Sequence, residues 1–91
     1  MSFQWDERKA KANLKKHGVS FEEAKTVFAD LNMKLTPDEE HSFDEDRSKV
    51  LGMSRRLRIL VIGCCYRDHT VRIFSARKAT PSETKRYFGG G

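Results

Sequence analysis

Alternating and helically spaced apolar residues predict the order of elements along the first part of the chain. Phe3-Gln4-Trp5 alternates between apolar and polar positions, which predicts a short edge strand. A helix follows, with Asp6 as its N-cap, an end near His17 and Gly18 as a left-handed stop. The apolar stripe of this helix is thin, so we expect it to remain partly exposed.

A second, more hydrophobic helix is predicted from Ser20 to about Asp30. Ser20 and Glu23 have the spacing of a capping box, in which each side chain binds a free backbone N–H at the start of the helix. The apolar residues that share one face of this helix are Phe21, Ala24, Val27, Phe28 and Leu31. We therefore expect the second helix to pack against the core.

The second half of the chain predicts a sheet and one more helix. Strands are expected at residues 33–36, 47–54, 57–67 and 69–77, with an acidic loop before the second of them and turns at Arg55-Arg56 and near Asp68. The strand at 57–67 is almost continuously apolar, which favours a central place in the sheet. Thr80-Pro81-Ser82-Glu83 predicts the start of a helix that runs to about Phe88.

These elements define the expected fold class and domain. The class is α+β, with two N-terminal helices packed on a mainly antiparallel sheet of about four strands and a short C-terminal helix. A chain of 91 residues is expected to form a single domain, here residues 1–88. Residues 89–91 are expected to be a flexible glycine tail, and whether these glycines are native stays open.

Charge is distributed unevenly between the two halves of the chain. Residues 47–91 contain 11 Lys or Arg and 2 acidic residues, whereas residues 1–46 contain 7 Lys or Arg and 11 acidic residues. Such segregation is typical of a protein that meets a polyanion, of which nucleic-acid phosphate is the commonest. The alternative is an ordinary solvated surface.

Cysteine usage and hydropathy bear on the compartment and on cofactors. Cys64 and Cys65 are neighbours in a predicted strand, so they should point to opposite faces and neither pair nor share a metal ion. No secretory signal and no apolar stretch of about 20 residues is present in the sequence. We expect a cytoplasmic protein without a metal or other cofactor.

The chain contains candidate residues for metal-free cleavage of RNA. That reaction needs a base for the 2′-hydroxyl, cations for the dianionic phosphorane and an acid for the leaving oxygen. His41 titrates nearest neutrality and could serve as base or acid, or could be a solvated loop histidine. A calcium loop around His41, Asp44 and Asp46 lacks the glycine and distal glutamate of that motif.

Arg47, Arg77 and Tyr66 complete the candidate catalytic set. Arg47 begins one predicted strand and could approach Tyr66 near the end of its antiparallel neighbour. An arginine fork suits a phosphate, and a tyrosine could donate a proton or stack on a base. The alternatives are structural: Arg47 could pair with nearby carboxylates, Arg77 with Glu83, and Tyr66 could edge the core.

Other cations are assigned to RNA positioning rather than to chemistry. Cationic turns and strand ends bind backbone phosphate without specific geometry. The positions concerned are Arg55, Arg56, Arg58 and Lys78. His17 is expected to stabilise the C-terminus of the first helix through its dipole, and His69 to be solvated in a turn.

Three blocks of the sequence resemble the BrnT family. They are FQWDERKAKANLKKHGVSFEEAKTVFAD, EDRSKVLGMS and RIFSARKATPSETKRYF, and from the first to the last they span nearly the whole chain, residues 3–88. The resemblance implies a type II toxin with a RelE-like fold that cleaves RNA and is neutralised by a BrnA-like antitoxin. It also implies that operator DNA is reached only through the ribbon-helix-helix domain of that antitoxin.

The same resemblance favours two arginines as site residues but does not exclude functions other than RNA cleavage. Arg47 of EDR and Arg77 of SAR match basic positions of the family pattern, which favours them for catalysis or phosphate binding. RelE-like toxins use varied catalytic side chains, so the fold does not identify the base. A non-catalytic nucleic-acid-binding or corepressor module, or a pure protein-interaction domain, would also fit the basic half of the chain.

Overall fold

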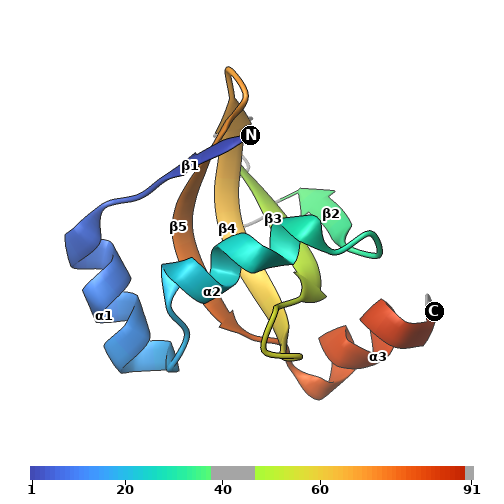
Figure 1. Ribbon diagram of the computed structural model, residues 1–91. Helices are drawn as coiled ribbons and strands as arrows, with labels where there is room; N and C mark the ends of the chain where they lie inside the picture. The colour runs from blue at the N-terminus through green and yellow to red at the C-terminus, as the bar shows by residue number, and fades with distance from the viewer. Residues whose placement is uncertain (38–46, 90–91) are drawn as a thin grey trace.

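The computed structural model describes residues 1–37 and 47–89, with the side chains of residues 36 and 37 excepted. Figure 1 shows the order of the elements along the chain. They are β1 (Ser2–Gln4), α1 (Glu7–His17), α2 (Phe21–Thr26), the 3-10 turn η1 (Val27–Ala29), β2 (Lys34–Pro37), β3 (Arg47–Met53), β4 (Ile59–Arg67), β5 (Thr70–Lys78) and α3 (Pro81–Gly89).

A five-stranded sheet in the order β1-β5-β4-β3-β2 forms the centre of the molecule. All neighbouring strands are antiparallel except β1, which runs parallel to β5. The α+β class and the central place of β4 are confirmed. The described strands number five rather than about four, because two short edge strands, β1 and β2, flank the three longer ones.

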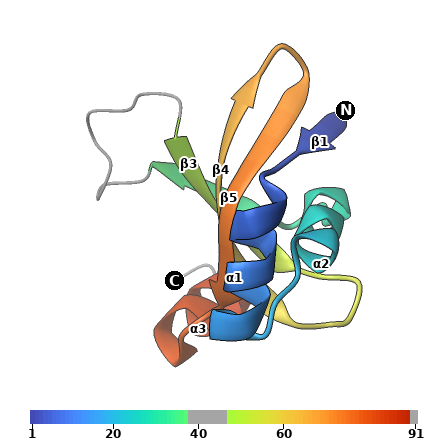
Figure 2. The ribbon, with the colours of Figure 1, turned by 90° about the vertical axis from the view of Figure 1, so that its left-hand side faces the viewer.

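Helices cover the two faces of the sheet unequally. Figure 2 shows the sheet nearly edge-on, with α2 on one side and α3 against the lower end of the other. The larger core cluster lies under α2 and includes Phe21, Val27, Leu60, Ile62 and Ile73. The smaller cluster joins Tyr87 of α3 to Leu51 and Val61. Much of the face opposite α2 is therefore left for polar side chains.

Helix α1 forms as the sequence predicts. The Asp6 side chain accepts hydrogen bonds from the backbone N–H groups of Arg8 and Lys9, and Gly18 ends the helix at φ 69°. A left-handed residue at this position costs glycine little and other residues more. The exposed fraction of Leu14 is 50%, which agrees with a partly exposed helix.

The prediction of one continuous second helix to Asp30 is wrong in its last part. The α-helix ends at Thr26 and continues only as the 3-10 turn, and Leu31 is 99% exposed rather than buried. Asp30 leaves the helical conformation, and its carboxylate accepts from the backbone N–H groups of Asn32 and Met53 and from the Tyr87 hydroxyl. These three bonds stabilise the extended conformation of Asp30 and end the helix before Leu31.

Asn13 of α1 binds the backbone at the edge of β5 where β1 no longer pairs with it. The register of β1 extends only to Arg72 of β5. Further along, the Asn13 side-chain amide accepts from the N–H of Ala76 at 3.1 Å and donates to its C=O at 2.8 Å, as a neighbouring strand would. A second amide hydrogen donates to the C=O of Val19 at 2.9 Å. Asn13 is only 8% exposed, so these bonds satisfy buried groups.

The structure also bears on membrane insertion. Among the described residues, no helix has the length and apolar character needed to cross a bilayer.

Candidate nucleic-acid interface

The described strands are strongly basic and the charge lies mainly on one face. Together they contain seven Lys or Arg and no Asp or Glu. Side chains alternate along a strand, so the pairing register assigns each cation to a face. Six of the seven lie opposite α2, and we call them the basic face: Lys34, Arg47, Lys49, Arg67, Arg72 and Arg77.

The basic face is organised in rows across the strands. Arg47, Cys65 and Arg72 pair across β3, β4 and β5. Neighbouring strands lie about 5 Å apart, so this row brings two arginines to the same end of the face. Arg72 also donates to the Gln4 side chain at 2.9 Å, a neutral partner that leaves its positive charge in place.

The next row is formed by Lys49, Gly63 and Ser75. A Cβ atom on Gly63 would lie 2.5 Å from the Ser75 hydroxyl oxygen, so glycine allows this side chain to lie over the strand. A register shift between Gly63 and Cys64 places one additional residue, Phe74, in β5 beside this row. The middle of the basic face therefore has only the small side chain of Ser75 above β4, with Lys49 beside it.

Arg47 lies against an aromatic ring of that bulge. Its guanidinium carbon is 4.3 Å from the centroid of the Phe74 ring, and the Lys9 ammonium of α1 is 5.7 Å from the same centroid. Both distances are within the range of cation–π attraction. The predicted catalytic arginine is thus half-buried and positioned by packing.

Arg77 stands at the other end of the basic face and is bound by α3. Its two terminal nitrogens donate to the two carboxylate oxygens of Glu83, at 2.7 and 3.0 Å. Glu83 also accepts from the backbone N–H of Thr80, which completes the predicted capping box. Arg77 therefore makes the ion pair with Glu83 that was the structural alternative to phosphate binding, and this pair attaches α3 to the sheet.

This ion pair predicts a specific loss of stability in acid. The Arg77 guanidinium is the main cause that lowers the pKa of Glu83 from 4.5 to about 2. A carboxyl group whose pKa is depressed on folding stabilises the protein above its unfolded pKa and loses that contribution as pH falls to its folded pKa. Urea unfolding of the parent and of Glu83→Gln should give a difference in unfolding free energy that shrinks between about pH 5 and about pH 2.

Glutamine keeps the helix cap but loses the charge, and the other carboxyl groups titrate in both proteins. A difference that stays constant over this range would contradict the assignment of the ion pair.

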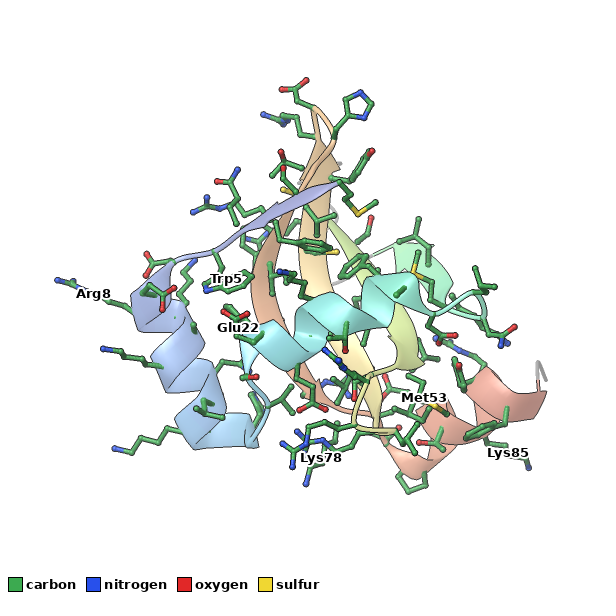
Figure 3. The ribbon with its side chains drawn as sticks, in the orientation of Figure 1. Trp5, Arg8, Glu22, Met53, Lys78 and Lys85 are labelled. Atoms are coloured by element: carbon green, nitrogen blue, oxygen red, sulfur yellow. The ribbon has the colours of Figure 1, made fainter. Side chains whose placement is uncertain are left out.

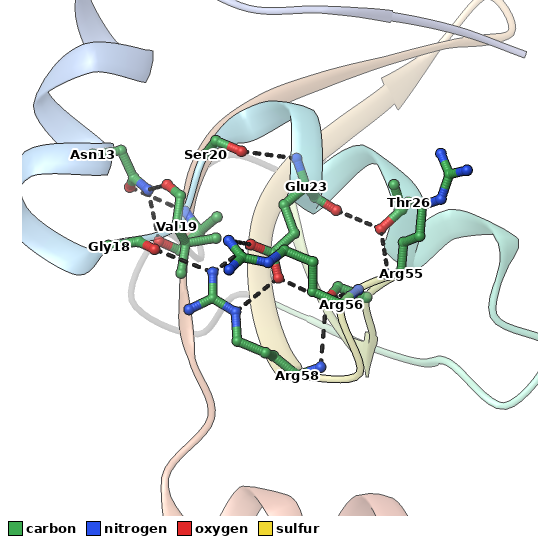
Figure 4. A network of polar contacts seen from close by, with 11 residues as sticks. Asn13, Gly18, Val19, Ser20, Glu23, Thr26, Arg55, Arg56 and Arg58 are labelled. Atoms are coloured by element: carbon green, nitrogen blue, oxygen red, sulfur yellow. Dashed lines mark hydrogen bonds and ion pairs between the residues drawn. The ribbon is translucent and has the colours of Figure 1, made fainter.

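The predicted RNA-positioning arginines lie elsewhere, in the turn between β3 and β4 (Figure 4). Arg58 donates to both carboxylate oxygens of Glu23 and to the C=O of Gly18. The bond to Arg58 is the main cause that lowers the pKa of Glu23, whose side chain is 5% exposed. Arg58 therefore holds the turn against α2, a structural role that the sequence does not reveal.

Arg55 and Arg56 extend from the same turn. The backbone N–H of Arg55 donates to the Thr26 hydroxyl at 2.8 Å, and the Arg56 guanidinium lies 3.8 Å from Glu23 with 71% of its side chain exposed. Lys78 lies on the α2 side at the end of β5, near the lower end of the sheet in Figure 3. The structure thus places this group apart from the basic face that holds Arg47 and Arg77.

Tyr66 also differs in placement from Arg47. Arg47 pairs with Cys65, so the side chain of Tyr66 emerges on the opposite face of β4. Tyr66 is 55% exposed and its hydroxyl lies 3.5 Å from Nδ1 of His69, in the two-residue turn where Asp68 and His69 both have positive φ. The register therefore does not bring Tyr66 to the basic face.

The remaining predicted groups have different outcomes. His41, the proposed proton-transfer residue, lies outside the described residues. The two cysteines are free and point to opposite faces, as predicted, and burial raises the pKa of Cys64 to about 12. Within residues 1–37 and 47–89 no group of three or more His, Cys, Asp or Glu could hold a metal ion.

Sequence reasoning missed several residues of this region. Cations at Arg47 and Lys49 alternate with the residue between them, a period-two signal that could have placed both on one face. Arg72 follows from the same periodicity once β5 is assigned. Phe74 depends on the bulge, and Lys9 depends on how α1 packs beside β5, so neither has a signal in the sequence.

Comparison with known proteins agrees with this architecture. A family model described as the ribonuclease toxin BrnT of type II toxin–antitoxin systems matches residues 5–83. The crystal structure of the Brucella abortus ribonuclease toxin BrnT superposes with a TM-score of 0.69 at 25% sequence identity, covering 88% of this chain and 97% of that chain. No curated protein sequence gives a significant match. The chain therefore belongs to the BrnT family of ribonuclease toxins of type II toxin–antitoxin systems.

Proposed function

We propose that this protein is a metal-independent endoribonuclease that uses the basic face to bind and cleave RNA. The observation that carries the proposal is the concentration of six of the seven strand cations on one face of a sheet whose described strands contain no carboxylate. Such a face attracts phosphate and can stabilise additional negative charge on it.

The proposed reaction is attack of the RNA 2′-hydroxyl on the adjacent phosphorus. The P–O bond to the 5′-oxygen breaks, a 2′,3′-cyclic phosphate forms, and the 5′-oxygen leaves with a proton. Arg47 is proposed to stabilise the dianionic phosphorane. Arg77, at the other end of the basic face, is proposed to bind a phosphate of the same strand in the orientation that Glu83 gives it. His41 is the proposed proton-transfer residue, whereas Tyr66, on the opposite face of β4 from Arg47, is proposed only to contact RNA outside the cleavage point.

Substrate outside the cleavage point would meet the second group of cations. Arg55, Arg56 and Lys78 are proposed to bind flanking phosphates from the α2 side of the sheet, and Arg58 holds the turn of Arg55 and Arg56 in place through Glu23. These contacts are exposed, so each should contribute modestly and fade with salt.

The biological setting is proposed from the family. Cleavage of cellular RNA would inhibit growth, and a BrnA-like antitoxin with a ribbon-helix-helix domain would neutralise the toxin. Operator DNA would be bound only through that antitoxin.

The proposal is tested with the purified, antitoxin-free chain and a labelled RNA in EDTA. We expect shorter products that end in 2′,3′-cyclic phosphate, because no step of the proposed reaction uses a metal ion. Addition of Mg²⁺ should leave the end chemistry unchanged. RNA that is bound but stays intact would instead favour a non-catalytic nucleic-acid-binding module, and RNA that is neither bound nor cut would exclude both.

A further inference from the structure

Two cations from distant parts of the sequence converge on one phenylalanine. Arg47 of β3 and Lys9 of α1 both lie over the Phe74 ring, at 4.3 and 5.7 Å from its centroid. Their charges are therefore within about 10 Å of each other. Arg72, two residues before Phe74, adds a third positive charge to the same end of the basic face.

Cations gathered at one end of a face raise the positive potential there and attract anions. The π face of Phe74 helps to gather them, because it carries a negative quadrupole that attracts both cations. A phosphate is the anion that the proposed substrate carries.

We propose that Phe74 assembles Arg47 and Lys9 into a subsite for one RNA phosphate. In this subsite Lys9 is a substrate-binding residue contributed by α1, and Phe74 is a positioning residue that holds the Arg47 guanidinium against its ring. The bulge after Gly63 is what brings Phe74 to this place. The inference rests on the proposed function and assigns to it two residues from outside the predicted set.

Helix α1 provides a matched control for Lys9. Lys11 carries the same charge on the same helix, but residues two apart point in directions about 200° different around an α-helix. Lys9→Gln and Lys11→Gln therefore change net charge equally and differ only in the direction of the lost cation. Both positions are exposed, so both variants should fold.

The experiment measures binding of a single-stranded RNA oligonucleotide with 2′-O-methyl groups, which cannot be cleaved, over a series of salt concentrations. Lys9→Gln should weaken binding several-fold and lower the slope of log K against log salt by about 0.7, the loss of one phosphate contact on a single strand. Lys11→Gln should leave the slope unchanged. Equal effects of the two variants would overturn the subsite.

Phe74 is tested by its coupling to Lys9. Phe74→Leu removes the ring, whereas Phe74→Tyr keeps it, so only the first should weaken RNA binding. In the Phe74→Leu background the difference between Lys9→Gln and Lys11→Gln should shrink, which a purely structural role of Phe74 does not predict. An undiminished difference would overturn the role of Phe74.

The outcomes also separate this inference from the proposed function. A parent that binds and cleaves RNA while Lys9→Gln and Lys11→Gln behave alike overturns the subsite alone. A parent that binds no RNA overturns both.

Discussion

Alanine at Arg47 should lower the rate of RNA cleavage by about 100-fold or more, the usual cost of removing one preorganised group that stabilises transition-state charge. Arg47 is the predicted catalytic residue that the structure places on the basic face and holds against an aromatic ring. Single-turnover cleavage with saturating protein would measure the effect on the chemical step. Arg47→Lys should recover only part of the rate, because lysine keeps the charge but lacks the planar fork.

Arg8→Ala is the matched control for that experiment. Arg8 is an exposed arginine that projects from α1 away from the sheet (Figure 3), so its loss changes net charge equally without touching the basic face. Thermal unfolding should show that both variants keep the fold. Similar cleavage rates for Arg47→Ala and the parent would remove Arg47 from the mechanism.

The largest effect on stability is expected for Asn13→Ala, with a loss of about 2–4 kcal/mol in the free energy of unfolding. The side chain binds the N–H and C=O of Ala76 and the C=O of Val19, and all three backbone groups would lose a buried partner. For a chain of this size, the melting temperature should fall by at least about 10 °C. Urea and thermal unfolding would measure both quantities.

Asn32→Ala is the corresponding control. Asn32 is exposed, and its bond to Asp30 uses the backbone N–H, which alanine keeps. Its stability should stay within about 0.5 kcal/mol of the parent. If Asn13→Ala were equally mild, water or a shift of α1 would be satisfying the edge of β5 in place of the amide.

The local rules of helix ends account for what the sequence predicts well. Asp6, Gly18, Ser20 and Thr80 act through the backbone of their own turn, so a few neighbouring residues suffice to identify them. The central place of β4 and the exposure of α1 follow from hydrophobic patterning in the same way. The prediction that Leu31 is buried fails because its exposure depends on bonds that Asp30 makes to Met53 and Tyr87, which are distant in sequence.

The candidate site was predictable only in part, for the same reason. Charge counting finds the basic half of the chain, and alternation can place Arg47 on one face of a strand. It cannot show that Arg58 is engaged by Glu23 or that Arg77 is engaged by Glu83, since an arginine has the same pattern whether it faces a carboxylate or a phosphate. The role of Phe74 needs the bulge, which appears only when β4 and β5 are paired.

The parallel pairing of β1 with β5 has a consequence for the order of folding. Ser2 pairs with Thr70, and Asn13 binds Ala76, so the N-terminal segment makes these contacts across more than 60 residues of chain. Contacts of high sequence separation form late and slow the folding of a small domain. During synthesis on the ribosome, residues 2–13 must therefore wait for β5, the last of the described strands, before they can dock. A nascent chain would acquire Lys9 beside Phe74, and with it one flank of the proposed RNA-binding surface, only after β5 has been synthesised.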